Sequence, residues 1–255
     1  VAIDGALRLQ NGQAVITGLP SQFEDIYGRL QFQGQRITFD DTELRFGPIS
    51  VRVQGSVSPQ NGFQVGVTVP DVSVEQLETA FAQSLPVAAT GRFVLLTEVR
   101  GPLRTPRIAG NVRNLEPIAV DRLAFNQVSA TFSGNTQALS LDDLQVLPVT
   151  GGSLTASGQI DFEDRWLRAR KLPSTALALT ANVDLPLSPL ADLYGANLPV
   201  SLGRLTAAAE ITGPLFEPVG VANWQITDGI AVGGGRLDYA DRFATLSDTQ
   251  LAIAQ

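Results

Sequence analysis

The chain has 255 residues, of which 44% are hydrophobic and 17% are charged, and its formal net charge at pH 7 is −7. It contains no cysteine and no histidine, which excludes a disulfide framework, a Cys–His zinc site and a Ser–His–Asp catalytic triad. The acidic balance argues against nucleic acid as the main partner. The hydrophobic content is sufficient for a sizeable core.

The chain also lacks methionine, and it begins and ends inside strand-like patterns. We therefore expect it to be a segment of a longer polypeptide. It carries no signal peptide, and no apolar stretch approaches the ~18–20 residues that span a bilayer. Any membrane anchor is accordingly expected outside this segment.

Apolar and polar residues alternate along most of the chain. Near the N-terminus, for example, Leu30 and Phe32 share one face of such a run, and polar residues occupy the other. The alternation predicts half-buried strands, separated about every 8–12 residues by turn residues such as Asn11-Gly12 and Asn61-Gly62. Connections this short favour antiparallel pairing of neighbouring strands, so we expect an all-β fold.

Two segments interrupt the alternation and predict short amphipathic helices. The first begins with a capping box formed by Ser73 and Gln76 and continues to Phe81. The second begins with Ser188 as the N-cap, followed by proline at the first helical position and by Gly195 as the stop.

The two helices belong to an internal repeat. Gly91-Arg92 returns 112 residues later as Gly203-Arg204, and Gly101-Pro102-Leu103 returns at the same spacing as Gly213-Pro214-Leu215. A partial third copy precedes them. We therefore expect three units, namely a partial first repeat (1–70), a second repeat with helix then strands (71–184) and a truncated third repeat (185–255).

Paired carboxylates are the best candidates for chemistry, at Asp40-Asp41 and Asp142-Asp143. They suit acid–base work or calcium binding, but adjacent strand residues point to opposite faces, and aspartate also favours turns. We favour turns between strands, and we expect no catalytic, cofactor-binding or metal-binding residue.

A second candidate is the densest basic run, which contains one of the two tryptophans. It either contacts lipid headgroups or a protein partner, or it is a solvated connection between strands. Its residues are Arg165, Trp166, Arg168, Arg170 and Lys171.

The apolar face of the predicted strands is larger than two short helices can cover. It forms either a packed core or an open groove that accommodates acyl chains. From the alternation, the residues expected to line the inside are Leu30, Phe32, Ile37, Phe39, Leu44, Phe46, Val51, Val53, Val65, Val67, Phe93, Leu95, Val128, Phe132, Leu139, Leu141, Ile160, Phe162, Leu177 and Leu179.

A recurring phrase suggests a family. Gly101-Pro102-Leu103 is followed by Pro106-Arg107-Ile108-Ala109-Gly110, and the phrase returns in part at 213–218. Together with the Gly-x-Leu-x-Phe-x-Gly strand, it resembles the C-terminal half of the TamB family, the translocation and assembly module subunit of diderm bacteria. The chain also resembles the plastid inner-envelope relative of that family and the wider AsmA-like group. The second copy departs from the phrase, with Ala222 where Gly110 maps.

The resemblance implies a β-taco, which is an elongated, curled antiparallel sheet with an apolar groove along it. It implies a non-enzymatic scaffold in the periplasm, or in the plastid intermembrane space for the plastid relative. Such a scaffold carries phospholipid acyl chains between the inner and outer membranes and supports outer-membrane protein assembly. The implied partners are phospholipid, an Omp85-type outer-membrane protein and the inner membrane, with no cofactor and no nucleic acid.

Three alternatives stay open. The first is a structural β-solenoid or adhesin-like fibre with a dry, packed core. The second is a chaperone that adds strands of nascent outer-membrane proteins to an exposed sheet edge. The third is a glycan-acting enzyme, which needs convergent carboxylates, whereas the 25 acidic residues are dispersed along this chain.

Overall fold

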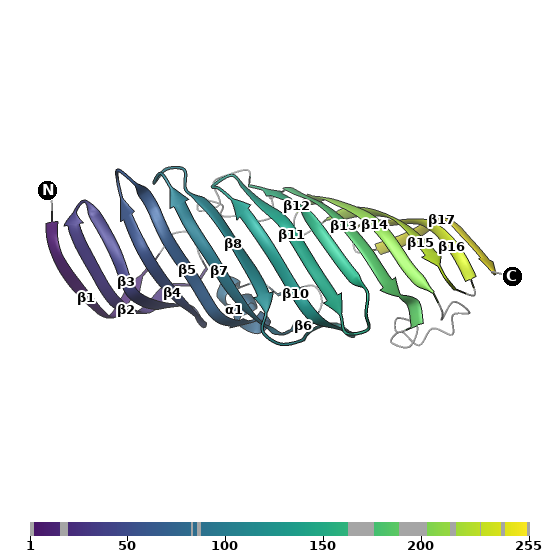
Figure 1. Ribbon diagram of the computed structural model, residues 1–255, viewed down its shortest axis with the longest axis horizontal. Coiled ribbons are helices and arrows are strands. Elements are labelled where there is room, and N and C mark those ends of the chain that lie inside the picture. The colour runs from purple at the N-terminus through teal and green to yellow at the C-terminus, as the bar shows by residue number, and fades with distance from the viewer. Residues whose placement is uncertain are drawn as a thin grey trace.

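The computed structural model describes residues 3–15, 20–82, 84–85, 88–162, 176–188, 203–214, 218–229, 231–240 and 243–253. Within these residues, seventeen strands form one antiparallel sheet. Figure 1 shows it as a long, curved ribbon with β1 and β17 at opposite ends. The expectation of an all-β, open and elongated antiparallel sheet is confirmed.

The strands are mostly 8 to 12 residues long. Their bounds are β1 (Ile3–Ala14), β2 (Phe23–Gly34), β3 (Arg36–Phe46), β4 (Ile49–Ser58), β5 (Gly62–Ser73), β6 (Ala89–Thr90), β7 (Arg92–Gly101), β8 (Arg107–Asn114), β9 (Ile118–Val120), β10 (Leu123–Gly134), β11 (Ala138–Pro148), β12 (Ser153–Asp161), β13 (Ala176–Pro186), β14 (Arg204–Pro214), β15 (Val219–Thr227), β16 (Ala231–Ala240) and β17 (Phe243–Ile253).

Strands pair in chain order. This holds from β1 to β5, then for β5 with β7, β7 with β8, β8 with β10, and again from β10 to β17. The short strands β6 and β9 pair with each other, and β9 also pairs with the first residues of β10. In the described part of the chain, the outer edges of β1 and β17 have no partner strand.

The first predicted helix is confirmed as α1 (Val74–Phe81). The Ser73 hydroxyl accepts a hydrogen bond from the Gln76 backbone N–H at 3.1 Å, and the Gln76 side chain accepts one from the Ser73 N–H at 2.9 Å. This reciprocal capping box satisfies two backbone donors at the start of α1. The helix ends at Ala82, which adopts a left-handed conformation. Of the second predicted helix, Ser188 is described and is already helical together with Leu187, so the helix begins before the predicted N-cap, and the part from Pro189 onward lies outside the described residues.

Two sequence expectations about turns were wrong. Asn11-Gly12 lies inside β1 at a register shift rather than in a hairpin, and Asn11 has a φ of 57°. Asp40-Asp41 and Asp142-Asp143 also lie inside strands, where the register shifts between residues 39 and 42 and between 141 and 144. Such bulges insert an extra residue and bend the strand. By contrast, Asn61 lies in the turn between β4 and β5, as predicted.

The 112-residue spacing is also visible in the backbone. Gly91 and Gly203 have φ values of 147° and 142°, and Gly101 and Gly213 have values of 99° and 102°. These conformations favour glycine at each site, because a Cβ disfavours such positive φ values. The proposed boundaries of the three units stay a prediction.

Candidate functional site

The candidate site is the apolar face of the sheet, which the strand register makes continuous. Residues directly opposite each other in neighbouring strands share a face. On β2 and β3, Leu30 lies opposite Phe39, and Phe32 lies opposite Ile37. Two strands further along, Val53 lies opposite Val67.

Bulges keep the apolar residues on this face where the spacing in the sequence would reverse it. Phe39 faces Gly55 and Thr42 faces Val53, so the extra residue at the Asp40-Asp41 bulge restores the alternation for the rest of β3. The β5–β7 pair has the same arrangement, with its register shift between Val69 and Val72. The bulges therefore bend the strands without interrupting the apolar face.

The face continues through the second half of the sheet. Leu139 lies opposite Ile160, which in turn lies opposite Leu177 on β13. All twenty residues predicted to line the inside fall on this one face by register, with Phe162 directly after β12, and each is buried or half-buried. Whether they contact lipid stays a prediction.

The register adds residues that the sequence analysis missed, because it used only short, clean runs of alternation. The same alternation extended along whole strands would have found them. The apolar residues that join the face in this way are Leu7, Val57, Phe63, Val99, Ile108, Val112, Leu144, Val146, Leu154, Val183, Ile211 and Trp224.

Charged side chains lie on the opposite face and pair with one another there. Arg52 Nε is 2.8 Å from Glu43 Oε1. Arg204 Nη2 is 2.6 Å from Asp184 Oδ2. In a third pair, the hydrogen bond from Arg236 lowers the pKa of the Asp238 carboxyl. All of these groups are exposed, so the pairs contribute little to stability and mainly keep charge away from the apolar face.

Helix α1 covers one part of the apolar face, at the lower rim of the sheet in Figure 1. Ala80 of the helix is fully buried, in a cluster with Phe46, Ile49, Val69 and Val72. Phe46 is one of the predicted lining residues, and it is therefore closed off by the helix. Leu187, at a helical position directly after β13, is buried against Leu205 and Ile226 of this face. The described strands form one sheet, so these residues include no second sheet that covers the rest of the apolar face.

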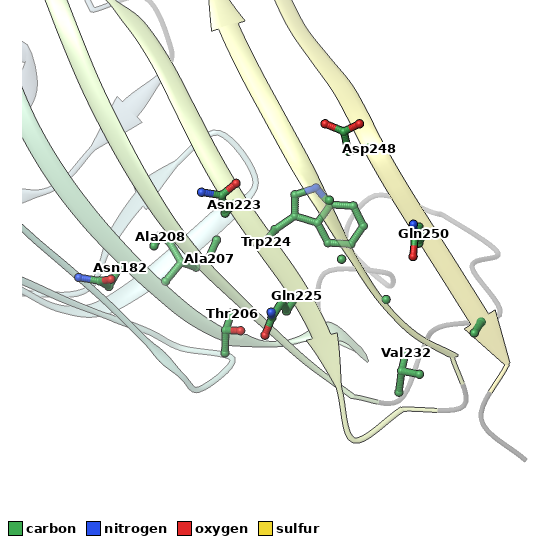
Figure 2. Close-up of a pocket in the computed structure, with 15 residues that line it drawn as sticks. Asn182, Thr206, Ala207, Ala208, Asn223, Trp224, Gln225, Val232, Asp248 and Gln250 are labelled. Carbon is green, nitrogen blue, oxygen red and sulfur yellow. The ribbon is translucent and has the colours of Figure 1, made fainter.

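A hollow of about 980 Å³ spans β13 to β17, and Figure 2 shows the residues that line it. Its lining includes the amides of Asn182, Asn223 and Gln225, which the register places on the polar face. Trp224 also lines it, and its buried indole N–H has no hydrogen-bond partner among the described residues. Asp248 is the one carboxylate among the described lining residues, and the amides around it donate and accept hydrogen bonds.

The described residues also bear on two other possibilities, a metal-binding cluster and a membrane-spanning helix. They contain no cluster of three or more acidic side chains that would hold a metal ion. None of their helices is long and apolar enough to cross a membrane. The predicted headgroup-contact or partner-contact run lies between β12 and β13, outside the described residues, and consists of Arg165, Trp166, Arg168, Arg170 and Lys171.

Comparison with known proteins finds plant relatives. The chain is 25% identical to Protein TIC236, chloroplastic, of Arabidopsis thaliana, over 82% of this chain and 11% of that protein. It is 24% identical to Protein SUBSTANDARD STARCH GRAIN 4, chloroplastic, of Oryza sativa subsp. japonica, over 88% of this chain and 12% of that protein. No family model and no solved structure matches the chain. The chain spans about a tenth of these relatives' length, and the matches confirm its resemblance to the plastid relative of the TamB family.

Proposed function

We propose that this segment belongs to a non-enzymatic envelope scaffold whose apolar face carries the acyl chains of phospholipids between two membranes. The observation that supports this proposal is the continuous apolar face. It follows the strand register from Leu7 on β1 to Trp224 on β15, and the charged side chains that form ion pairs lie on the opposite face of the sheet. A dry fibre needs a second layer over that face, and in the described residues only α1 and Leu187 cover parts of it.

The energetics favour a hydrocarbon occupant. Exposing an acyl chain of about 16 carbons to water costs roughly 12 kcal/mol, at about 0.8 kcal/mol per methylene. A face lined by leucine, valine, isoleucine and phenylalanine removes most of that cost. A bilayer interior is similarly apolar, so a lipid can leave it for this face with a small net change in free energy. Headgroups would stay in water.

The proposed location is the space between two envelope membranes. The chloroplastic relatives support a plastid envelope, and within that envelope we propose the intermembrane space. In a diderm bacterium the equivalent place is the periplasm. There the full-length chain would be anchored in the inner membrane outside this segment, and an Omp85-type outer-membrane protein would be its partner. Support of outer-membrane protein assembly belongs to the same proposal.

A second candidate function is suggested by the sheet edges. The outer edges of β1 and β17 have no partner strand among the described residues, so they offer backbone groups to an incoming strand. A chaperone that adds strands of nascent outer-membrane proteins would use these edges rather than the apolar face.

The test is native mass spectrometry with lipid extraction on the purified segment. Phe39→Glu and Val67→Glu place charge on the apolar face, and Gln33→Glu and Gln64→Glu place the same charge on the exposed polar face of β2 and β5. We expect phospholipid to co-purify with the parent and the polar-face variants and to be lost from the apolar-face variants. A folded parent that is free of lipid and refuses added phospholipid would contradict the proposal and favour strand addition.

A further inference from the structure

A cavity of about 420 Å³ lies between α1 and the short strands β6 and β9. Its walls include Val74, Leu77 and Phe81 from the helix, Phe93 from β7, and Ile118 and Val120 from β9. These side chains come from segments separated by up to 46 positions in the chain, and the sheet brings them together around one carbon-lined space.

The cavity opens on the same face as the candidate lipid-binding surface. Ile118 lies opposite Phe125, and Val120 lies opposite Leu123, so both project to the apolar side of β10. Phe93, which was predicted to line the inside, also packs against the buried cluster beneath α1. The apolar face therefore leads into this cavity beside the helix.

The lining indicates what kind of molecule fits. A peptide would bring backbone N–H and C=O groups, and burying them without hydrogen-bond partners is costly. The polar side chain of Glu78 is already engaged, because its Oε1 accepts a hydrogen bond from the Leu85 N–H at 2.6 Å. A hydrocarbon chain has no hydrogen-bonding groups, so burying it in the cavity leaves no polar atom without a partner. For comparison, an engineered cavity of about 150 Å³ lined by leucine, isoleucine and phenylalanine stays dry and binds benzene.

The charge at the cavity distinguishes a free fatty acid from a phospholipid as the source of the hydrocarbon chain. Glu78 is the charged residue among the described lining residues, and no lysine or arginine accompanies it there. A free fatty acid that entered with its carboxylate first would bring this group near the Glu78 carboxylate, which is unfavourable. A phospholipid chain can enter only by its methyl end, because its carboxyl end is esterified. Phe81 is 44% exposed and Leu85 is 50% exposed, so apolar surface is available for that chain to cover.

We propose that this cavity binds the methyl end of one phospholipid acyl chain, with α1 as one wall. The inference rests on the proposed function and adds a fixed stopping place to it. An acyl chain that moves along the apolar face would be held beside α1, so the face is not uniform along its length.

The experiment uses the whole segment and phosphatidylcholine vesicles in which the acyl chain carries a diazirine near its methyl end. After photolysis, mass spectrometry identifies the crosslinked peptides. Val120→Phe and Ala89→Phe each fill the cavity from a different strand, and thermal unfolding checks that each variant is folded. Val219→Phe is the matched control, because Val219 is 45% exposed and lies on the polar face of β15.

We expect crosslinks to residues 74–82, 84–85, 88–93 and 118–120 in the parent and the Val219 variant, and at least a fivefold loss of these crosslinks in both cavity-filling variants. Crosslinks elsewhere on the apolar face should persist in all of them. If the parent crosslinks only elsewhere on that face, the cavity site is wrong and the proposed function stands. A folded parent with no crosslinks at all would overturn both.

Discussion

At the residue scale, aspartate often occupies the positions where the backbone adopts a left-handed conformation. Five aspartates have φ values between 45° and 58°, namely Asp25, Asp41, Asp121, Asp228 and Asp248. Short polar side chains tolerate this left-handed conformation, because they can hydrogen-bond to the local backbone. Of the paired carboxylates that first suggested chemistry, Asp41 therefore has a structural role at the bulge in β3.

The bulge at Asp41 gives a direct test. Asp41→Gly should leave stability unchanged or raise it, whereas Asp41→Val should lower the free energy of unfolding by about 1–2 kcal/mol, because valine disfavours a left-handed φ. Asp40→Val is the control, since its neighbour Asp41 takes the positive φ and both residues are exposed. Denaturant unfolding measures all three. Equal losses for the two valine variants would show that backbone conformation is not the reason for aspartate here.

At the scale of the element, α1 is held by its cap as well as by its apolar face. The capping box between Ser73 and Gln76 is joined by a hydrogen bond from the Gln76 Nε2 to the Pro48 carbonyl at 3.0 Å. Gln76 thus connects the first turn of the helix to the turn between β3 and β4. A helix of eight residues has little stability of its own, so these contacts determine whether it stays on the sheet.

Ser73→Ala should destabilise α1 by about 1 kcal/mol, because the Gln76 N–H loses its acceptor. Hydrogen exchange of the α1 amides should become about fivefold faster, while the amides of β12 and β13 keep their protection. Ser50→Ala, at an exposed position of β4, is the matched control and should change neither. Faster exchange throughout the sheet would instead mean that α1 does not open independently.

At the scale of the whole molecule, the open edges predict self-association of the isolated segment. Unpaired strand edges readily pair with another chain. On β17, Phe243 is 75% exposed and Leu246 is 60% exposed. We expect the mean mass in sedimentation to rise with concentration, and Phe243→Lys with Leu246→Lys to suppress that rise. Val219→Lys, on the interior strand β15, should leave it unchanged. Association that is insensitive to the β17 lysines would place the contact elsewhere.

Much of the fold was predictable because its signals are local. Strand alternation, the capping box of α1 and the turn at Asn61 each depend on a few neighbouring residues. The bulges were less accessible, since Asn11-Gly12 has the same composition as a hairpin turn. A signal was nevertheless present in the spacing. Phe39 and Thr42, like Val69 and Val72, are three residues apart where strict alternation requires two.

The cavity beside α1 was not predictable from the sequence. Its walls include Val74 and Val120, and nothing in either local pattern indicates that these residues approach each other. Their proximity depends on the side ladder of β6 and β9, in which Ala89 lies opposite Val120. A two-residue strand such as β6 has no alternation to detect.

Because β10 to β17 pair in chain order, the sheet could become longer or shorter without rearrangement of the existing strand pairs. Adding one hairpin extends such a sheet by about 10 Å, since neighbouring strands lie about 4.8 Å apart. Every existing pair would keep its register, and an even number of strands would preserve the direction of the next one. Under the proposed function, duplication or deletion of hairpins would match the span of the protein to the separation of the two membranes, and a change in that separation during evolution would be recorded as a change in hairpin number.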